Sequence, residues 1–143
     1  MVLSEASTTP SRIPILIIDD DPILLDSVKE LLLFEGYDVH AVCAGDDGLA
    51  LAGELLPRCI LLDLKLRDTD GYGVLRQLKK HQVTRHIPVI VLSAYSQEQY
   101  HTEALALGAF AFITKPFNTR ALLAQIKKSV LERTSHEHDT GHG

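Results

Sequence analysis

The stretch ILIIDDDP, residues 15–22, indicates a buried β-strand that leads directly into a helix. Its first four residues are aliphatic and three of them are β-branched, which is typical of a strand covered on both faces. Asp21 is predicted to cap a helix that begins at Pro22, because proline is tolerated at the first helical position. Apolar residues then recur at helical spacing up to Gly36, which is predicted to end the helix.

The same alternation of a short aliphatic run and an amphipathic segment recurs along the chain. The further predicted strands cover residues 39–42, 59–62, 89–92 and 110–113. The further predicted helices cover residues 48–56, 72–80 and 97–107, and Asn118 is predicted to cap a last one. Five strands that alternate with five helices imply a parallel sheet with helices on both faces. We therefore predict a three-layer α/β/α sandwich over residues 13–132, with a flexible N-terminal segment (1–12) and a flexible C-terminal tail (133–143).

Composition narrows the class of protein. A length of 143 residues suits one domain, and the formal charge of −5 comes without a cluster of Lys and Arg, which disfavours direct binding to nucleic acid. The polar start and the lack of an apolar run near roughly 20 residues argue against a signal peptide or membrane anchor, so we expect a cytoplasmic protein. Cys43 and Cys59 are predicted to lie in the second and third strands as small core residues, about 10 Å apart and beyond disulfide reach.

Polar side chains stand where the predicted strands end. The first strand is followed by Asp19 and Asp20, the third by Asp63, the fourth by Ser93, and the fifth runs into Lys115. Ligands of open parallel sheets collect at this carboxyl edge. Clustered carboxylates repel one another unless a cation intervenes, and an all-oxygen ligand set suits Mg²⁺. A carboxylate beside a metal can attack phosphorus and become an acyl phosphate, so the predicted site suits phosphoryl transfer.

Four segments carry a resemblance to a known family. They are ILIIDDDP (15–22), LLDLKLRDTDGY (61–72), VLSAY (91–95) and GAFAFITKPF (108–117). In order and spacing they resemble the four signatures of response-regulator receiver domains of two-component signal transduction, the CheY-like superfamily. The resemblance covers roughly residues 13–132 and implies a flavodoxin-like fold with strand order 2-1-3-4-5.

The resemblance also implies roles for the acidic residues. Asp63 corresponds to the phosphoacceptor. Asp20 resembles the direct Mg²⁺ ligand of the acidic pair, and the resemblance implies that Asp19 would act mostly through water. The main-chain carbonyl of Lys65 would be a further ligand.

Other positions correspond to the phosphate-sensing residues of the family. Ser93 matches the hydroxyl residue that follows the phosphoryl group, and Lys115 matches the lysine that contacts it. Family members usually hold the bond before the proline at Pro116 in cis. Phe112 stands at the aromatic position that rotates inward on activation. The face formed by the fourth and fifth strand–helix units, on which Phe112 lies, is the expected partner surface.

Some residues depart from the family pattern. Arg67 replaces a proline that is frequent in the loop after the phosphoacceptor, so this loop is expected to be less rigid. Phe112 lacks the hydroxyl of the commoner tyrosine, which puts in doubt any switch step that needs a hydrogen bond there. Lys65 and Tyr95 occupy the two variable positions that flank the phosphate. Because both side chains are bulky, we predict slow self-dephosphorylation.

The function expected from these residues is that of a signalling switch rather than an enzyme with turnover. A sensor histidine kinase or a histidine phosphotransfer protein would phosphorylate Asp63, within a two-component system or a phosphorelay. The sequence does not identify the downstream effector, and it is compatible with a homodimer that forms on phosphorylation. Two alternatives remain: a receiver-shaped adaptor that works without phosphorylation, and an aspartate-nucleophile phosphatase. The phosphatase is disfavoured because Lys65 stands where such enzymes carry a second aspartate.

Overall fold

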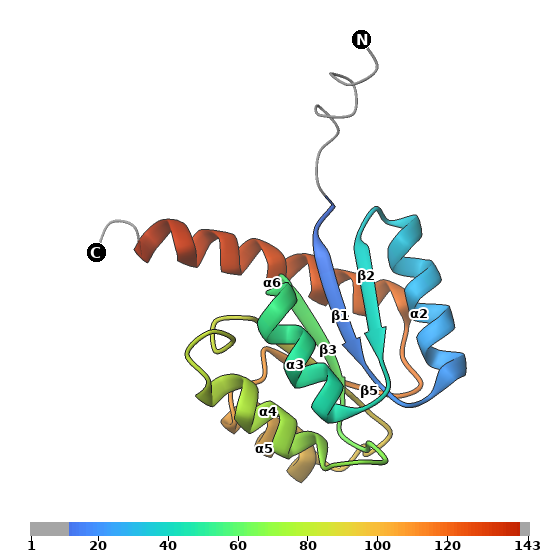
Figure 1. The fold of residues 1–143 in the computed structure, drawn as a ribbon. Coiled ribbons are helices and arrows are strands. Elements are labelled where there is room, and N and C mark those ends of the chain that lie inside the picture. The colour runs from blue at the N-terminus through green and yellow to red at the C-terminus, as the bar shows by residue number, and fades with distance from the viewer. Residues whose placement is uncertain (1–11, 141–143) are drawn as a thin grey trace.

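The computed structural model describes residues 12–140, and within this range side chains are described up to residue 132. It forms a parallel five-stranded sheet in the order β2-β1-β3-β4-β5 (Figure 1). The strands are β1 (Pro14–Ile18), β2 (Asp38–Val42), β3 (Cys59–Asp63), β4 (Val89–Ser93) and β5 (Ala111–Thr114). The predicted fold class and strand order are therefore confirmed.

Helices cover both faces of this sheet. They are α2 (Pro22–Phe34), α3 (Gly45–Leu55), α4 (Gly71–Lys80), α5 (Glu98–Ala106) and α6 (Thr119–Thr140). Helices α2 and α6 pack on one face, and α3, α4 and α5 pack on the other (Figure 1). Helix α6 continues to Thr140, beyond the domain boundary predicted at residue 132. Residues 1–11 and 141–143 lie outside the described part of the chain, so the predicted flexibility of both ends stays a prediction.

Two hydrophobic cores result from the alternation of side chains along each strand. In β1, Ile15 and Ile17 face α2 and α6, whereas Leu16 and Ile18 face α3, α4 and α5. All four side chains are fully buried, as expected for a central strand of a parallel sheet.

Local signals account for several helix ends. The Asp21 carboxylate accepts hydrogen bonds from the N–H groups of Ile23 and Leu24, at 3.1 and 3.4 Å, which confirms it as the N-cap of α2. Gly36 and Gly108 follow α2 and α5 with φ angles of 94° and 105°, a conformation that favours glycine. The predicted helix ends at these glycines are therefore confirmed.

Helix α3 begins at Gly45, three residues before the predicted start at Gly48. Its local N-cap residue makes no side-chain hydrogen bond. Instead, the carboxylate of Asp68, in the loop after β3, accepts hydrogen bonds from the N–H groups of Gly45 and Asp46 at 2.9 and 3.3 Å. Those N–H groups lower the pKa of Asp68. A distant residue thus caps the helix, which no local sequence pattern indicates.

The two cysteines behave differently from each other. Cys59 is buried at the start of β3, as predicted, and burial raises the pKa of its thiol to about 12. Cys43 is exposed, so the prediction that it is a core residue of the second strand is wrong. The reason is that β2 ends one residue earlier, at Val42, and Cys43 belongs to the turn before α3.

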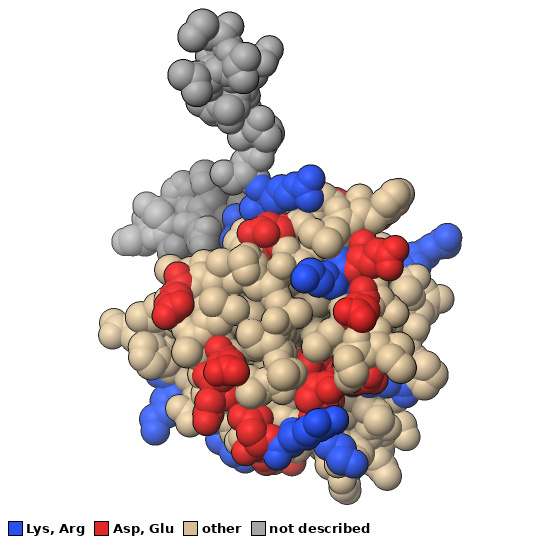
Figure 2. All heavy atoms as spheres, turned by 45° about the vertical axis from the view of Figure 1, so that its right-hand side comes forward, with Lys and Arg blue, Asp and Glu red and all other residues tan. Residues whose placement is uncertain are grey.

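Charged residues of both signs are interspersed over the face of the molecule in Figure 2.

Within residues 12–140, no helix combines the length and the apolar character that crossing a bilayer requires.

Candidate functional site

The carboxyl edge of the sheet brings together three carboxylates from two neighbouring strands. Ile18 pairs with Leu62, so Asp19 and Asp20 leave β1 beside the end of β3, where Asp63 lies. One oxygen from each of the three carboxylates lies within 4.8 Å of the others. The predicted convergence of these residues is therefore observed.

Lys115 reaches this cluster from the end of β5. Its Nζ lies 2.9 Å from Oδ2 of Asp19 and 3.4 Å from Oδ2 of Asp63. The Lys115 main-chain N–H donates to the Ser93 carbonyl at 2.7 Å, and the Lys115–Pro116 bond is cis, as the resemblance implied. Burial alone would lower the pKa of the lysine, but the hydrogen bonds and charges of the two carboxylates raise it above its ordinary value. Lys115 is therefore a firmly held cation.

Asp63 is almost fully buried, with 6% of its surface exposed. Burial raises the pKa of its carboxyl group to about 6, and the charge of Asp19 contributes in the same direction. The Lys115 ammonium and the N–H of Lys65, which donates to Oδ1 at 3.2 Å, act against this shift. The net result is that Lys115 and the Lys65 N–H together do not offset the effects of burial and of the Asp19 charge on the Asp63 pKa.

The acidic pair at the end of β1 is asymmetric. Asp19 is fully buried and both of its oxygens are engaged, Oδ2 with Lys115 and Oδ1 with the N–H of Asp21 at 2.9 Å. Asp20 is only half-buried. Its Oδ2 lies 3.7 Å from Nε of Arg67, whose side chain is 85% exposed. An incoming ion would therefore meet Asp20 more readily than Asp19.

The donor set of the cluster fits a hard divalent cation. All three candidate side chains offer oxygen, and neither histidine nor cysteine belongs to this group. Three carboxylates face Lys115 and the exposed Arg67, so the cluster retains negative charge that a divalent ion would neutralise. The carbonyl of Lys65 was expected to be a further ligand. The main chain of this residue is held by an antiparallel bridge to Asp70 and by the hydrogen bond that its N–H donates to Asp63.

Ser93 ends β4 and is fully buried. Its Oγ accepts a hydrogen bond from the N–H of Tyr95 at 3.0 Å, which leaves the hydroxyl hydrogen for another acceptor. Helix α5 begins only at Glu98, so Ser93 is not its cap. Phe112 is half-buried in β5, paired with Val91, and it packs into the same core as Val91 on the face covered by α3, α4 and α5.

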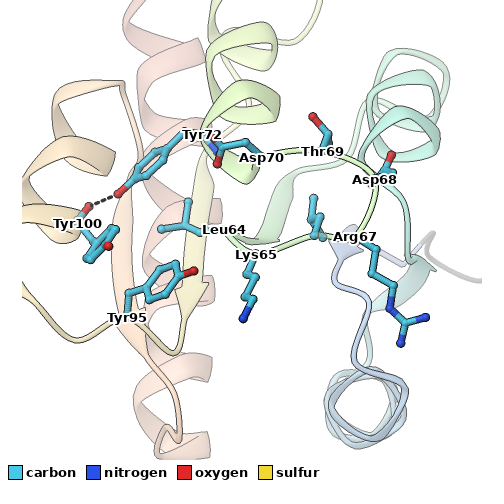
Figure 3. A pocket seen from close by; sticks show the side chains of 10 residues that line it. Leu64, Lys65, Arg67, Asp68, Thr69, Asp70, Tyr72, Tyr95 and Tyr100 are labelled. Atoms are coloured by element: carbon cyan, nitrogen blue, oxygen red, sulfur yellow. Dashed lines mark hydrogen bonds between the residues drawn. The ribbon is translucent and has the colours of Figure 1, made fainter.

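A cavity of about 450 Å³ lies between the β3–α4 loop and the start of α5 (Figure 3). Its wall on the α5 side contains three tyrosines that contact one another. The rings of Tyr95 and Tyr100 are stacked, with centroids 4.5 Å apart, and the Tyr72 hydroxyl donates to the Tyr100 carbonyl at 3.1 Å. In Figure 3, Arg67 points away from the tyrosines, whereas Lys65 extends from the loop between the tyrosines and Arg67. No sequence pattern indicated these contacts between the tyrosines.

Comparison with known proteins identifies the class that this fold and site define. Residues 15–127 match the response regulator receiver domain, and the chain belongs to this family of two-component signalling domains. It is 42% identical over 120 residues to the DNA-binding dual master transcriptional regulator RpaA of Synechocystis, a match that covers 84% of this chain and 49% of that protein. The chain spans about half the length of the curated relatives it matches.

Solved structures agree with this assignment. A CheY-like receiver domain protein from Methanospirillum hungatei is 35% identical with a TM-score of 0.82, and the match covers 88% of this chain and 99% of that one. The receiver domain of a sensor histidine kinase from Pseudomonas aeruginosa is 25% identical with a TM-score of 0.78, over 84% of this chain and 98% of that one. That domain has a magnesium ion coordinated in its active site cleft.

Proposed function

We propose that Asp63 accepts a phosphoryl group from a phosphohistidine donor in a Mg²⁺-dependent reaction. The observation that carries this proposal is the buried Asp63 carboxylate, which lies within 4.8 Å of Asp19 and Asp20 and 3.4 Å from the Lys115 ammonium. Family membership and the magnesium ion of the Pseudomonas receiver domain support it.

In the transfer, an Asp63 oxygen forms a bond to phosphorus while the bond from phosphorus to the imidazole nitrogen breaks. The imidazole leaves with the electron pair of that bond, and Asp63 becomes an acyl phosphate. Lys115 is close enough to bind a phosphoryl oxygen, and Ser93 has a hydroxyl hydrogen to donate to another. These residues supply alignment and charge stabilisation, which is most of what phosphoryl transfer requires of a protein.

The metal would be held by Asp20, Asp63 and the main-chain carbonyl of Lys65, with Asp19 acting through water. The two engaged oxygens of Asp19 and the half-buried position of Asp20 support this division. When bound, Mg²⁺ supplies neutralisation of the crowded carboxylates and of the phosphoryl oxygens.

Phosphorylation would then be read as a change in conformation. The Ser93 hydroxyl turns to the phosphoryl oxygen, and Phe112 rotates inward on the same face of the sheet. This step needs only packing, because Phe112 has no hydroxyl. The altered surface is the one formed by α5, β5 and α6. The phosphoryl group thus biases an equilibrium between two arrangements.

The partner that donates the group is a sensor histidine kinase or a histidine phosphotransfer protein, and the protein acts in the cytoplasm as a switch rather than through turnover. We propose no direct DNA binding by this chain, because its net charge is −5 and its Lys and Arg residues form no cluster along the sequence. The adaptor alternative gains no support from the site, since the acidic cluster and Lys115 are all present. The phosphatase alternative gains none either, since Lys65 stands where such an enzyme would carry its second aspartate.

The lifetime of the phosphoryl group is proposed to be long. Tyr95 is half-buried and its ring is held against Tyr100, so it can shield the site from water. Replacing Lys65 and Tyr95 together with alanine is expected to accelerate loss of the phosphoryl group, followed by intact mass after removal of the donor. Equal decay rates in the variant and the parent would contradict the shielding role.

The central test uses a small acyl-phosphate donor with Mg²⁺ and intact-mass measurement. We expect the mass of one phosphoryl group to be added to the parent protein and not to Asp63→Ala. Asp46→Ala is the matched control, because Asp46 is an exposed aspartate of α3 outside the carboxylate cluster, and it should take up label normally. Full labelling of Asp63→Ala, or none of the parent with any phosphohistidine or acyl-phosphate donor, would refute the proposal.

A further inference from the structure

Two consecutive residues of α5 each stack on an aromatic ring, one on Tyr95 near the proposed switch and one on the switch residue Phe112. Tyr100 stacks on Tyr95, with centroids 4.5 Å apart and the ring planes at 19°. His101 stacks on Phe112, with centroids 5.1 Å apart and the planes at 9°. The first turn of a single helix therefore contacts both the segment after Ser93 and the aromatic residue of β5.

Apart from the hydrogen bond of the Tyr72 hydroxyl to the Tyr100 carbonyl, few contacts hold this part of α5. Ala104 is its only buried residue, and the N-cap residue Gln97 makes no side-chain hydrogen bond. Most of its remaining side chains are exposed. The two stacks are therefore a large part of what fixes the start of α5 on the sheet.

The Tyr95 contact is tied to the phosphate-sensing residue. The Tyr95 N–H donates to Ser93 Oγ at 3.0 Å, so a movement of the Ser93 hydroxyl toward a phosphoryl oxygen disturbs the position of Tyr95. On the other side, the Tyr72 hydroxyl bonds the Tyr100 carbonyl and connects the start of α5 to α4 (Figure 3).

We propose that Tyr100 and His101 form a clasp that holds Tyr95 and Phe112 in the resting arrangement and opens when Asp63 is phosphorylated. The two residues are positioning residues, since they act through Tyr95 and Phe112 and do not touch the phosphoryl group. The inference rests on the proposed function, because it takes Ser93 and Phe112 as the moving parts. It adds that α5 couples these two parts to each other.

A clasp that favours the resting state must oppose binding of anything that favours the phosphorylated state, because such coupling is reciprocal. Beryllofluoride, a phosphoryl analogue, is the probe, titrated with saturating Mg²⁺ by calorimetry. We expect His101→Ala to bind it roughly three- to tenfold more tightly than the parent, which is the range that the loss of one aromatic stack gives. His101→Phe keeps a flat ring on Phe112 and should restore the affinity of the parent.

Tyr100→Ala is expected to act in the same direction, but Tyr100 packs against the core, so His101→Ala carries the test. Gln99→Ala is the matched control, an exposed residue in the same turn, and its affinity should equal that of the parent. Unchanged or weaker binding in His101→Ala, with or without a lower melting temperature, overturns the clasp. If the parent neither binds beryllofluoride nor takes up a phosphoryl group, the proposed function fails instead.

Discussion

Helices α5 and α6 precede and follow the same strand, β5, yet they are attached to the sheet in different ways. Among its side chains up to residue 132, helix α6 buries Leu122, Ile126, Ser129 and Val130. It begins at a side-chain cap, because the Asn118 carboxamide accepts hydrogen bonds from the N–H groups of Arg120 and Ala121 at 2.8 and 3.2 Å. Helix α5 buries only Ala104 and has no side-chain cap. One helix is anchored by burial, and the other depends on ring stacking and on the hydrogen bond from Tyr72. The proposed switch residues Ser93 and Phe112 lie on the side of the weakly attached helix.

The strongest test of this contrast shortens one leucine in each helix. Leu122 of α6 is fully buried, so Leu122→Ala should lower the free energy of unfolding by about 2–5 kcal/mol. Leu105 of α5 is 42% exposed, and Leu105→Ala should cost roughly 1 kcal/mol or less, because little apolar surface is lost. Urea unfolding of both variants measures the difference. Equal losses would show that α5 is anchored as firmly as α6.

A second test asks whether α4, which lies on the same face as α5, belongs with the anchored helices. A methyl group on Gly71 would overlap the backbone of Asp63 and Leu64, so Gly71→Ala should lower the free energy of unfolding by about 1–3 kcal/mol. It should also reduce phosphoryl uptake, because the displaced backbone carries Asp63. Gly73, two residues later, has open space around it, and Gly73→Ala should be neutral or stabilising. A Gly71→Ala protein with parental stability and uptake would mean that this loop yields easily.

The helix caps provide a smaller and more local comparison. Asn118→Ala removes two hydrogen bonds at the start of α6 and should cost about 1 kcal/mol of unfolding free energy. Gln97→Ala removes no cap at the start of α5 and should change the stability by only a few tenths of a kcal/mol. Both values can be measured by urea unfolding. A loss at Gln97 as large as that at Asn118 would contradict the description of α5 as uncapped.

The features that could be predicted from the sequence are those set by local patterns. The aliphatic strands, the Asp21 and Asn118 caps and the polar residues at the strand ends are local patterns, and parallel topology brings such ends to one edge. For that reason Asp19, Asp63 and Lys115 could be placed in one site before the structure was known.

The sequence did not predict contacts that depend on how helices and loops pack. Asp68 caps α3 from a separate loop, and the two ring stacks of α5 join residues on different elements. Cys43 lies outside its predicted strand by a single residue, which is enough to move it from the core to the surface. The spacing of residues along the chain does not predict these features, because they depend on the positions of whole helices, strands and loops.

The smallest predicted effect concerns a weak link between the two sides of the site. Arg67 belongs to the loop before α4, and Asp20 belongs to the segment before the capped helix α2. Their 3.7 Å ion pair competes with Mg²⁺ for the same carboxylate, but the arginine side chain is 85% exposed, so the pair is weak. Arg67→Gln should therefore tighten Mg²⁺ binding by only about twofold, measured by calorimetry at low ionic strength, and the gain should shrink as salt screens the pair. Arg76→Gln makes the same change in net charge on the exposed surface of α4, and it should leave Mg²⁺ affinity unchanged. An equal gain in both variants would assign the effect to overall charge, and a loss of affinity in Arg67→Gln would show that the arginine supports the metal site instead of competing for it.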